Sequence, residues 1–74
     1  MDKESEVERR QEIANRIRSL REDNDLTIED MAQATGRSAK EYAARESGEM
    51  DLTFTFLYKC AHKLGVDITE LLTG

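Results

Sequence analysis

The 74-residue sequence contains no proline and no tryptophan, and it has a single cysteine and a single histidine. One cysteine cannot form an internal disulfide, and one cysteine with one histidine cannot supply the three or four ligands of a zinc site. We therefore exclude disulfide-rich and zinc-finger scaffolds and expect no metal and no cofactor. Because a chain this short buries only about 60% of its unfolded surface, its helices must pack well or a partner must help.

Long apolar runs are also missing. No apolar stretch approaches the roughly 20 residues of a membrane span. The charged N-terminus, Met1 to Arg10, has no apolar run behind it as a secretory signal would. We expect a cytoplasmic protein with no membrane partner, in which the single cysteine stays reduced.

Basic charge is in deficit, with 11 Lys and Arg against 16 Asp and Glu and a net charge of −5. A protein that holds nucleic acid by charge alone should be basic, because phosphate neutralisation supplies most non-specific affinity.

With one histidine, no Ser, Cys or Thr nucleophile has both a base and an orienting group at hand. The sequence therefore predicts that the protein is not an enzyme.

Glycine is scarce, and its positions divide the sequence into predicted helices. It occurs only at Gly36, Gly48, Gly65 and Gly74. Ile13, Ile17 and Leu20 share one helical face and predict a first helix over residues 6–22, with residues 1–5 as a frayed lead-in. No segment alternates with a period of two for long enough to predict a strand.

Hydroxyl residues followed three places later by an acid predict where the short helices begin. Thr27–Asp30 is such a capping box and predicts a helix over residues 28–35 that stops at Gly36. Ser38–Glu41 is a full capping box and opens a helix that ends at Gly48 in a left-handed cap. Thr53 is expected to cap a fourth helix over residues 54–64, and Asp67–Glu70 a single-turn helix that ends at residue 72.

The apolar residues of the fourth helix predict one buried and one exposed phenylalanine. Phe54, Leu57, Ala61 and Leu64 form a helical stripe, and Phe56 lies on a side that this stripe does not need. An exposed cluster of Phe56, Met50 and Leu72 would be a dimer or domain-docking patch. The alternative is that each of the three packs locally.

The second and third predicted helices form a helix-turn-helix around Gly36-Arg37, with Ala32 permitting a close crossing of the helices. In this motif the second helix usually reads the major groove of DNA. The motif and its surroundings resemble the Xre, or Cro/repressor-type, helix-turn-helix domain family. The residues that carry the resemblance are 17–22, 26–27, 31–32, Gly36, Ser38, Glu46, Gly48, 60–66 and 71–72.

The resemblance covers about residues 12–73, and it leaves residues 1–11 as a charged N-terminal extension of the first helix. It implies an all-α, five-helix lambda-repressor-like bundle. Through Glu41–Glu49 and Phe56–Cys60 the sequence also resembles the DNA-binding module that precedes a cupin domain in some bacterial regulators.

The implied function is that of a DNA-binding module of a bacterial transcriptional regulator. Its third helix, Ser38 to Ser47, would enter the major groove of double-stranded DNA. The implied reading positions are Ser38, Ala39, Lys40, Ala43, Ala44 and Ser47. Ile28 stands where the family often has a glutamine that grips the operator. The implied partners are a second copy in a homodimer or a C-terminal effector domain outside this chain.

The composition of this reading face favours an alternative. Specific base contacts usually come from Arg, Lys, Asn or Gln, whereas this face offers one lysine, two hydroxyls and three alanines. Residues 27–49 hold five acids and three bases, a balance of −2. The alternative is a protein-interaction or dimerisation module with the same fold and little DNA affinity. If the module binds DNA, we expect weak, salt-sensitive binding that needs a dimer or a second domain.

Several charged residues have two possible roles. Lys40 is the best candidate for a DNA contact, and otherwise it is a solvated side chain. Arg37 either lays its stem on apolar surface or contacts phosphate, and Arg45 is expected to be structural. Arg16 and Arg18 either contact phosphate or lie on a solvated face, paired with a nearby acid.

The resemblance also implies a buried ion pair between Arg21 and Glu46, which would fix the third helix against the first. We expect Tyr42 to lie in the core with its hydroxyl group reaching water. Cys60 is expected to be a small core residue.

Overall fold

The computed structural model describes residues 3–73, and these form an all-α bundle. The five helices are α1 (Lys3–Asp23), α2 (Ile28–Thr35), α3 (Ala39–Glu46), α4 (Phe54–Leu64) and α5 (Ile68–Thr73). No strand occurs among the described residues. The predicted fold class is therefore confirmed. Within the described residues, no helix is both long and apolar enough to cross a membrane.

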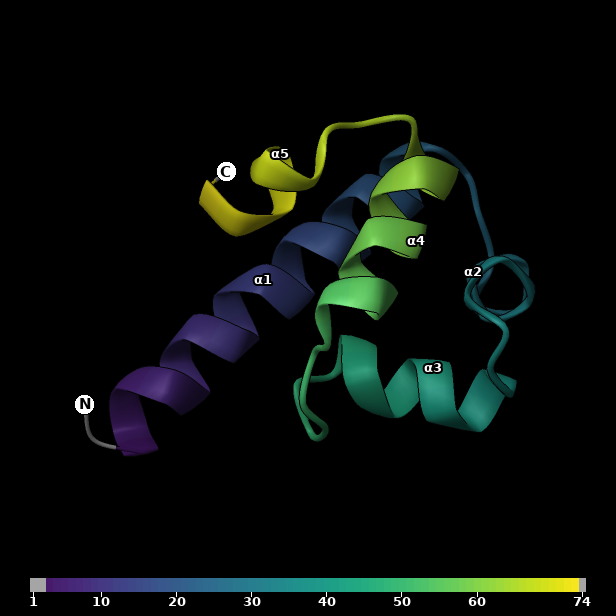
Figure 1. Ribbon diagram of the computed structural model, residues 1–74. Helices are drawn as coiled ribbons and strands as arrows, with labels where there is room; N and C mark the ends of the chain where they lie inside the picture. The colour runs from purple at the N-terminus through teal and green to yellow at the C-terminus, as the bar shows by residue number, and fades with distance from the viewer. Residues whose placement is uncertain (1–2, 74) are drawn as a thin grey trace.

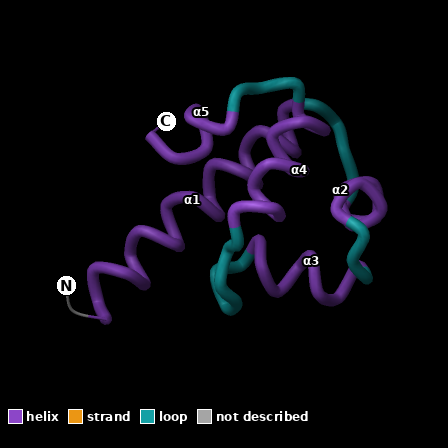
Figure 2. The backbone as a smooth tube through the Cα atoms, viewed as in Figure 1, coloured by secondary structure: helices purple, strands orange, loops and turns teal. Residues whose placement is uncertain are grey.

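The helices pack around one core. Figure 1 shows α1 as the long diagonal element, with α4 crossing it, α3 below them and α2 at the edge of the bundle. The short helix α5 returns to pack on α1 and α4. Short loops join the elements (Figure 2). The largest fully buried side chains are Tyr42, Phe56, Ile17, Met31, Leu71 and Cys60.

Local capping interactions fix the helix ends. At the start of α2, the Thr27 hydroxyl accepts a bond from the backbone N–H of Asp30, and the Asp30 carboxylate accepts one from the N–H of Thr27. The backbone bond from Thr27 lowers the pKa of Asp30. Thr53 caps α4 as predicted. Gly36 follows α2 with a φ of 69°, a left-handed conformation that favours glycine.

The backbone conformation at the end of α3 favours glycine. Gly48 follows the cap residue Ser47 and has a φ of 85°, so the predicted left-handed glycine is confirmed. A β-carbon at Gly48 would also collide with the side-chain amide of Gln11 on α1. The turn after α3 therefore lies directly against α1.

Helix α1 differs from its prediction at both ends. It begins by Lys3, so the expected frayed lead-in over residues 1–5 is wrong for Lys3 to Ser5, and residues 1–2 lie outside the described residues. At its C-terminal end, Asp25 takes the left-handed conformation with a φ of 56°, where many helices have glycine.

The charged extension is tied to the rest of the fold. α1 is continuous through the expected boundary between residues 11 and 12. Arg10 donates to the backbone oxygen of Gly48 at 2.9 Å and to the Asp51 carboxylate at 2.8 Å. Arg9 donates to the backbone oxygen of Leu72 at 3.2 Å. The N-terminal turns of α1 thus hold both the α3–α4 loop and the end of α5.

The prediction that Phe56 is exposed is wrong. Phe56 is 1% exposed and packs against Tyr42, with ring centroids 5.8 Å apart. Phe54 is 69% exposed and stacks on Tyr58 at the surface. Because Phe56 is buried, the proposed patch of Phe56, Met50 and Leu72 does not exist. The inward stripe of α4 consists of Phe56, Leu57, Cys60, Ala61 and Leu64.

Because Phe56 is buried and Phe54 is exposed, we expect a large loss of stability when Phe56 is replaced and a small one when Phe54 is replaced. Phe56→Ala removes a buried ring and should lower the free energy of unfolding by about 3–5 kcal/mol, which is most of the stability of so small a domain. Phe54→Ala removes an exposed ring and should change it by less than about 0.5 kcal/mol. Urea denaturation followed by circular dichroism measures both. Equal losses for the two variants would contradict this assignment.

Candidate nucleic-acid interface

Helices α2 and α3 form the predicted helix-turn-helix. Ala32 is buried at the crossing, and its backbone oxygen accepts a bond from the N–H of Arg37 at 2.9 Å, which closes the turn. The buried Thr35 hydroxyl donates to the backbone oxygen of Met31 at 2.8 Å. These two bonds close the turn within the chain, so α3 leaves it in a fixed direction.

A buried polar network holds α3 against α1. Arg21 donates from Nε to Glu46 Oε2 at 2.9 Å and from Nη2 to Glu46 Oε1 at 3.1 Å, so the ion pair is bidentate. The side chains are only 12% and 6% exposed. Arg21 also donates to the backbone oxygen of Leu26 at 2.9 Å. The hydrogen bond to Glu46 is the main cause that raises the pKa of Arg21.

Tyr42 completes this network. The prediction that its hydroxyl group reaches water is wrong. The hydroxyl group donates to Glu46 Oε2 at 2.5 Å. The ring is fully buried, as expected for a core residue. Burial, followed by the hydrogen bond to Glu46, raises the pKa of Tyr42. Tyr42 and Glu46 are four residues apart, so both face inward from α3 and the opposite side of the helix remains at the surface.

Two arginines place their guanidinium groups near the Phe56 ring. The Cζ atoms of Arg37 and Arg45 lie 5.8 and 5.4 Å from its centroid, within cation–π range. Arg45 also donates to the backbone oxygen of Asp51, in the structural role that we predicted. Arg37 forms an ion pair with Glu41 at 3.2 Å. Its Nε is buried, and its side chain as a whole is 28% exposed.

The candidate reading positions lie together on α3 and its flanks. Ser38, Lys40 and Ser47 are exposed, and the three alanines are half-buried. The Ser38 hydroxyl accepts from the backbone N–H of Glu41 at 3.1 Å, and the Ser47 hydroxyl donates to the backbone oxygen of Ala44 at 2.8 Å. Among the described residues Lys40 forms no ion pair. Lys40 is therefore a cation available to a ligand.

Three other candidates make contacts within the chain, two of them in the fold and one at its surface. Ile28 is half-buried and packs against the core, so it offers no hydrogen bond from its side chain. Arg16 donates to the backbone oxygens of Leu71 and Leu72, both at 3.1 Å, and thereby caps the end of α5. Arg18 pairs with Glu22 at 3.5 Å. Arg16 therefore has a structural contact, whereas Arg18 lies on a solvated face and pairs with a nearby acid at the surface.

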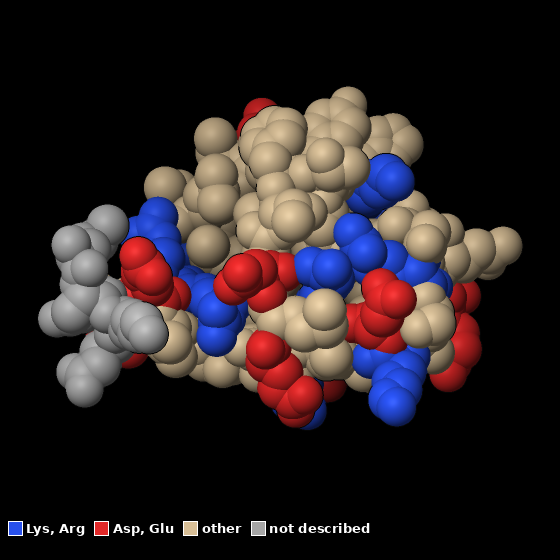
Figure 3. Space-filling model, turned by 60° about the horizontal axis from the view of Figure 1, so that its bottom comes forward, with Lys and Arg blue, Asp and Glu red and all other residues tan. Residues whose placement is uncertain are grey.

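The surface around α3 carries charges of both signs. Figure 3 shows Lys and Arg side chains across the middle of this face, interrupted by Asp and Glu, while the surface above them is largely uncharged. The field near α3 is therefore mixed, unlike the continuous basic patch of proteins that bind DNA mainly by charge.

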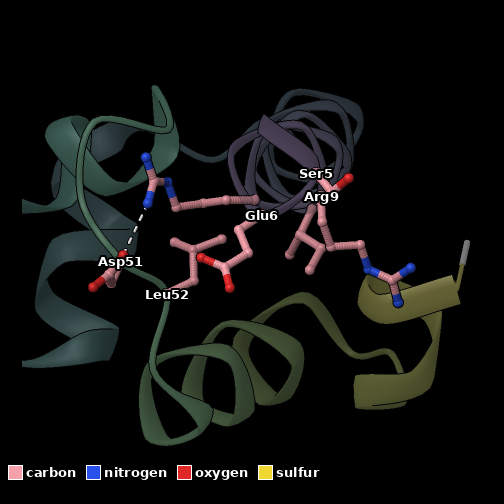
Figure 4. A pocket seen from close by; sticks show the side chains of 7 residues that line it. Ser5, Glu6, Arg9, Asp51 and Leu52 are labelled. Atoms are coloured by element: carbon pink, nitrogen blue, oxygen red, sulfur yellow. Dashed lines mark hydrogen bonds and ion pairs between the residues drawn. The ribbon is translucent and has the colours of Figure 1, made fainter. Parts of the chain in front are cut away.

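A separate groove of about 580 Å³ lies between the first turns of α1 and the loop before α4. Figure 4 shows the Glu6 carboxylate pointing toward Leu52, the Arg10–Asp51 pair on one side, and Arg9 directed toward α5. None of its lining residues belongs to α3. No group of three or more His, Cys, Asp or Glu side chains in the described part of the chain could hold a metal ion.

Residues 14–74 match the family described as helix-turn-helix domain, and the chain belongs to this family. The fold is similar to the crystal structure of the clp gene regulator ClgR from Corynebacterium glutamicum, with a TM-score of 0.81 and 25% sequence identity. The similarity covers 85% of this chain and 67% of that chain. A comparison with curated proteins gives no match. The resemblance to a module that precedes a cupin domain stays a prediction.

The Glu41 side chain has a different partner from the one that its spacing from Ser38 predicts. We predicted that Ser38–Glu41 forms a full capping box, but only the serine half is present. The Glu41 carboxylate instead bonds to Arg37, four residues earlier. The spacing of four between opposite charges was the available signal.

The buried network predicts that Glu46→Gln strongly destabilises the fold. The substitution removes the buried, bidentate counter-ion of Arg21 and leaves only the exposed Glu22 carboxylate at 3.9 Å, which should cost roughly 3 kcal/mol and lower the melting temperature by more than about 10 °C. Glu49→Gln is the matched control, because Glu49 is exposed and forms no ion pair among the described residues. Thermal melting should separate the two variants. An unchanged melting temperature for Glu46→Gln would rule out the network as an anchor.

The core also predicts a loss of stability in alkali. Burial raises the pKa of Cys60 to about 12, and the pKa of Tyr42 is raised as well. In the unfolded chain these groups ionise near about 8.5 and about 10, so above pH 8.5 the unfolded state binds fewer protons than the native state. The free energy of unfolding in urea should therefore fall as pH rises from about 8.5. Cys60→Ala should flatten the first part of this fall, and a stability independent of pH up to 11 would contradict the assignment.

Proposed function

We propose that the chain acts as the DNA-binding module of a bacterial transcription regulator and that α3 reads the major groove. The observation that carries the proposal is the family match over residues 14–74, together with an α3 that is anchored on one side and open on the other. A regulator of this kind works where the bacterial chromosome lies, so we also infer a cytoplasmic location.

The candidate reading positions on α3 and its flanks have different roles in this proposal. Lys40 supplies the available cation and contacts a phosphate or the edge of a guanine. Ala43 and Ala44 allow the helix backbone to approach the groove, and their methyl groups can contact thymine methyls. Ala39 packs against the core and supports the start of α3. Ser38 and Ser47 lie at the two ends of α3, where hydroxyl groups can reach the DNA backbone.

The charge balance limits the affinity of a single copy. With a net charge of −5 and one available lysine on α3, one module should bind weakly and lose affinity quickly as salt increases. Two copies on a palindrome, with half-sites about 34 Å apart, or a second domain on the same DNA would raise the effective concentration. We therefore propose a homodimer or a linked effector domain as part of the working regulator.

One observation favours a second candidate, a protein-interaction module with the same fold. Arg16, Arg37 and Arg45 all make contacts inside the protein, so fewer cations face DNA than the sequence suggests. The two candidates differ in whether the protein selects a DNA sequence at all.

Selection from a pool of random duplexes at low salt tests the DNA proposal. The wild type should enrich a defined sequence, and Lys40→Ala should weaken binding to it about three- to tenfold and reduce the salt dependence by about one counter-ion. Lys59→Ala removes the same charge from α4 and serves as the control. If no sequence is enriched at any salt concentration, the DNA proposal fails and the interaction module is favoured.

A further inference from the structure

Arg37 is held at the edge of the candidate reading face by a single carboxylate. It lies in the turn directly before the α3 cap residue, and its Nη1 is 3.2 Å from Glu41 Oε2. Its Nε is buried without a hydrogen-bond partner, and its Cζ lies 5.8 Å from the centre of the Phe56 ring. The ring and the carboxylate together fix the direction of the guanidinium group, and Glu41 supplies its negative charge.

This ion pair can open, unlike the other pair on α3. The side chains of Arg37 and Glu41 are 28% and 52% exposed, whereas the Arg21–Glu46 pair is largely buried. An exposed pair of this kind contributes little to folding, so its partner can be exchanged without unfolding the domain. A carboxylate and a phosphate bind the same guanidinium donors, so a phosphate of DNA competes directly with Glu41 for Arg37.

The geometry points to a regulatory role for Glu41. We propose that Glu41 is a latch: it occupies Arg37 in the free protein, and a DNA phosphate must replace it when α3 enters the groove. This inference rests on the proposed function and adds to it a residue that sets the affinity. Lys40, which has no such partner, makes the first contact, and Arg37 contributes only after the exchange.

A double-mutant cycle tests the latch. Glu41→Gln should tighten binding to a duplex about two- to fivefold at low salt, the strength of an exposed ion pair, and should steepen the salt dependence by about one counter-ion. In the Arg37→Gln background, the same change at position 41 should give a clearly smaller gain. The four proteins are wild type, the two single variants and the double variant, each checked by thermal melting.

The outcomes separate the latch from simple repulsion. If Glu41→Gln gives no gain, or gives the same gain with and without Arg37, the latch is overturned, because the effect is then absent or is only the loss of a negative charge. Glu8→Gln, an exposed position on α1, changes the net charge equally and should leave affinity nearly unchanged. Arg37→Met, which keeps a long apolar side chain near Phe56 but removes the charge, replaces Arg37→Gln in the cycle if the latter melts at a much lower temperature.

A measurement without DNA tells failure of the latch from failure of the proposed function. If no variant binds any duplex, the proposed function fails, and the latch is then tested with inorganic phosphate alone. Nuclear magnetic resonance of the Arg37 Nε–H group should show a response at a lower phosphate concentration in Glu41→Gln than in the wild type. An identical response in both proteins would overturn the latch.

Discussion

The hydrogen-bonded ion pair of Arg21 and Glu46, with the Tyr42 hydroxyl as its third member, is the constraint on which the candidate interface depends. A buried carboxylate must have its charge matched and its oxygens bonded, and here one arginine and one tyrosine do both. Because Tyr42 and Glu46 are one helical turn apart, satisfying them forces one side of α3 inward. The other side then faces solvent, whatever side chains it carries. The orientation of α3 is therefore set by groups that could never touch DNA.

The same packing explains how two arginines can stand beside the core of the bundle. The Phe56 ring lies under both guanidinium groups and supplies an apolar, electron-rich surface for Arg37 and Arg45. These arginines lie against this ring, and their charges are directed to Glu41 and to the backbone of Asp51. A count of the arginines in this region thus overstates the positive charge that is free to contact a ligand.

Features that depend on neighbours in the sequence could be predicted, and features that depend on distant packing could not. The caps at Thr27 and Thr53 and the end of α2 at Gly36 each involve residues three to five positions apart, and all were predicted from sequence. The choice between Phe54 and Phe56 depends on Tyr42 in another helix, because both phenylalanines fit a helical period. Arg16 bonds to Leu71 and Leu72, more than 50 positions away, and no local pattern signals this contact. The Arg21–Glu46 pair spans 25 positions and was expected only because the sequence resembles a known family.

The acidic composition acquires a more specific meaning once the pairs are assigned. A net charge of −5 says that long-range attraction to DNA is weak, but affinity at close range depends on which cations are unpaired at the surface of α3. Lys40 is unpaired among the described residues, and Arg37 is paired with an exposed carboxylate four residues away. Binding at this surface is then an exchange of one anion for another at Arg37, which yields less free energy than adding a phosphate to an unpaired cation. Such an exchange gains most where phosphates are presented at fixed positions by a duplex and where a second copy or domain keeps the module close to it. The same arrangement that makes one copy a weak binder therefore makes binding strongly dependent on assembly.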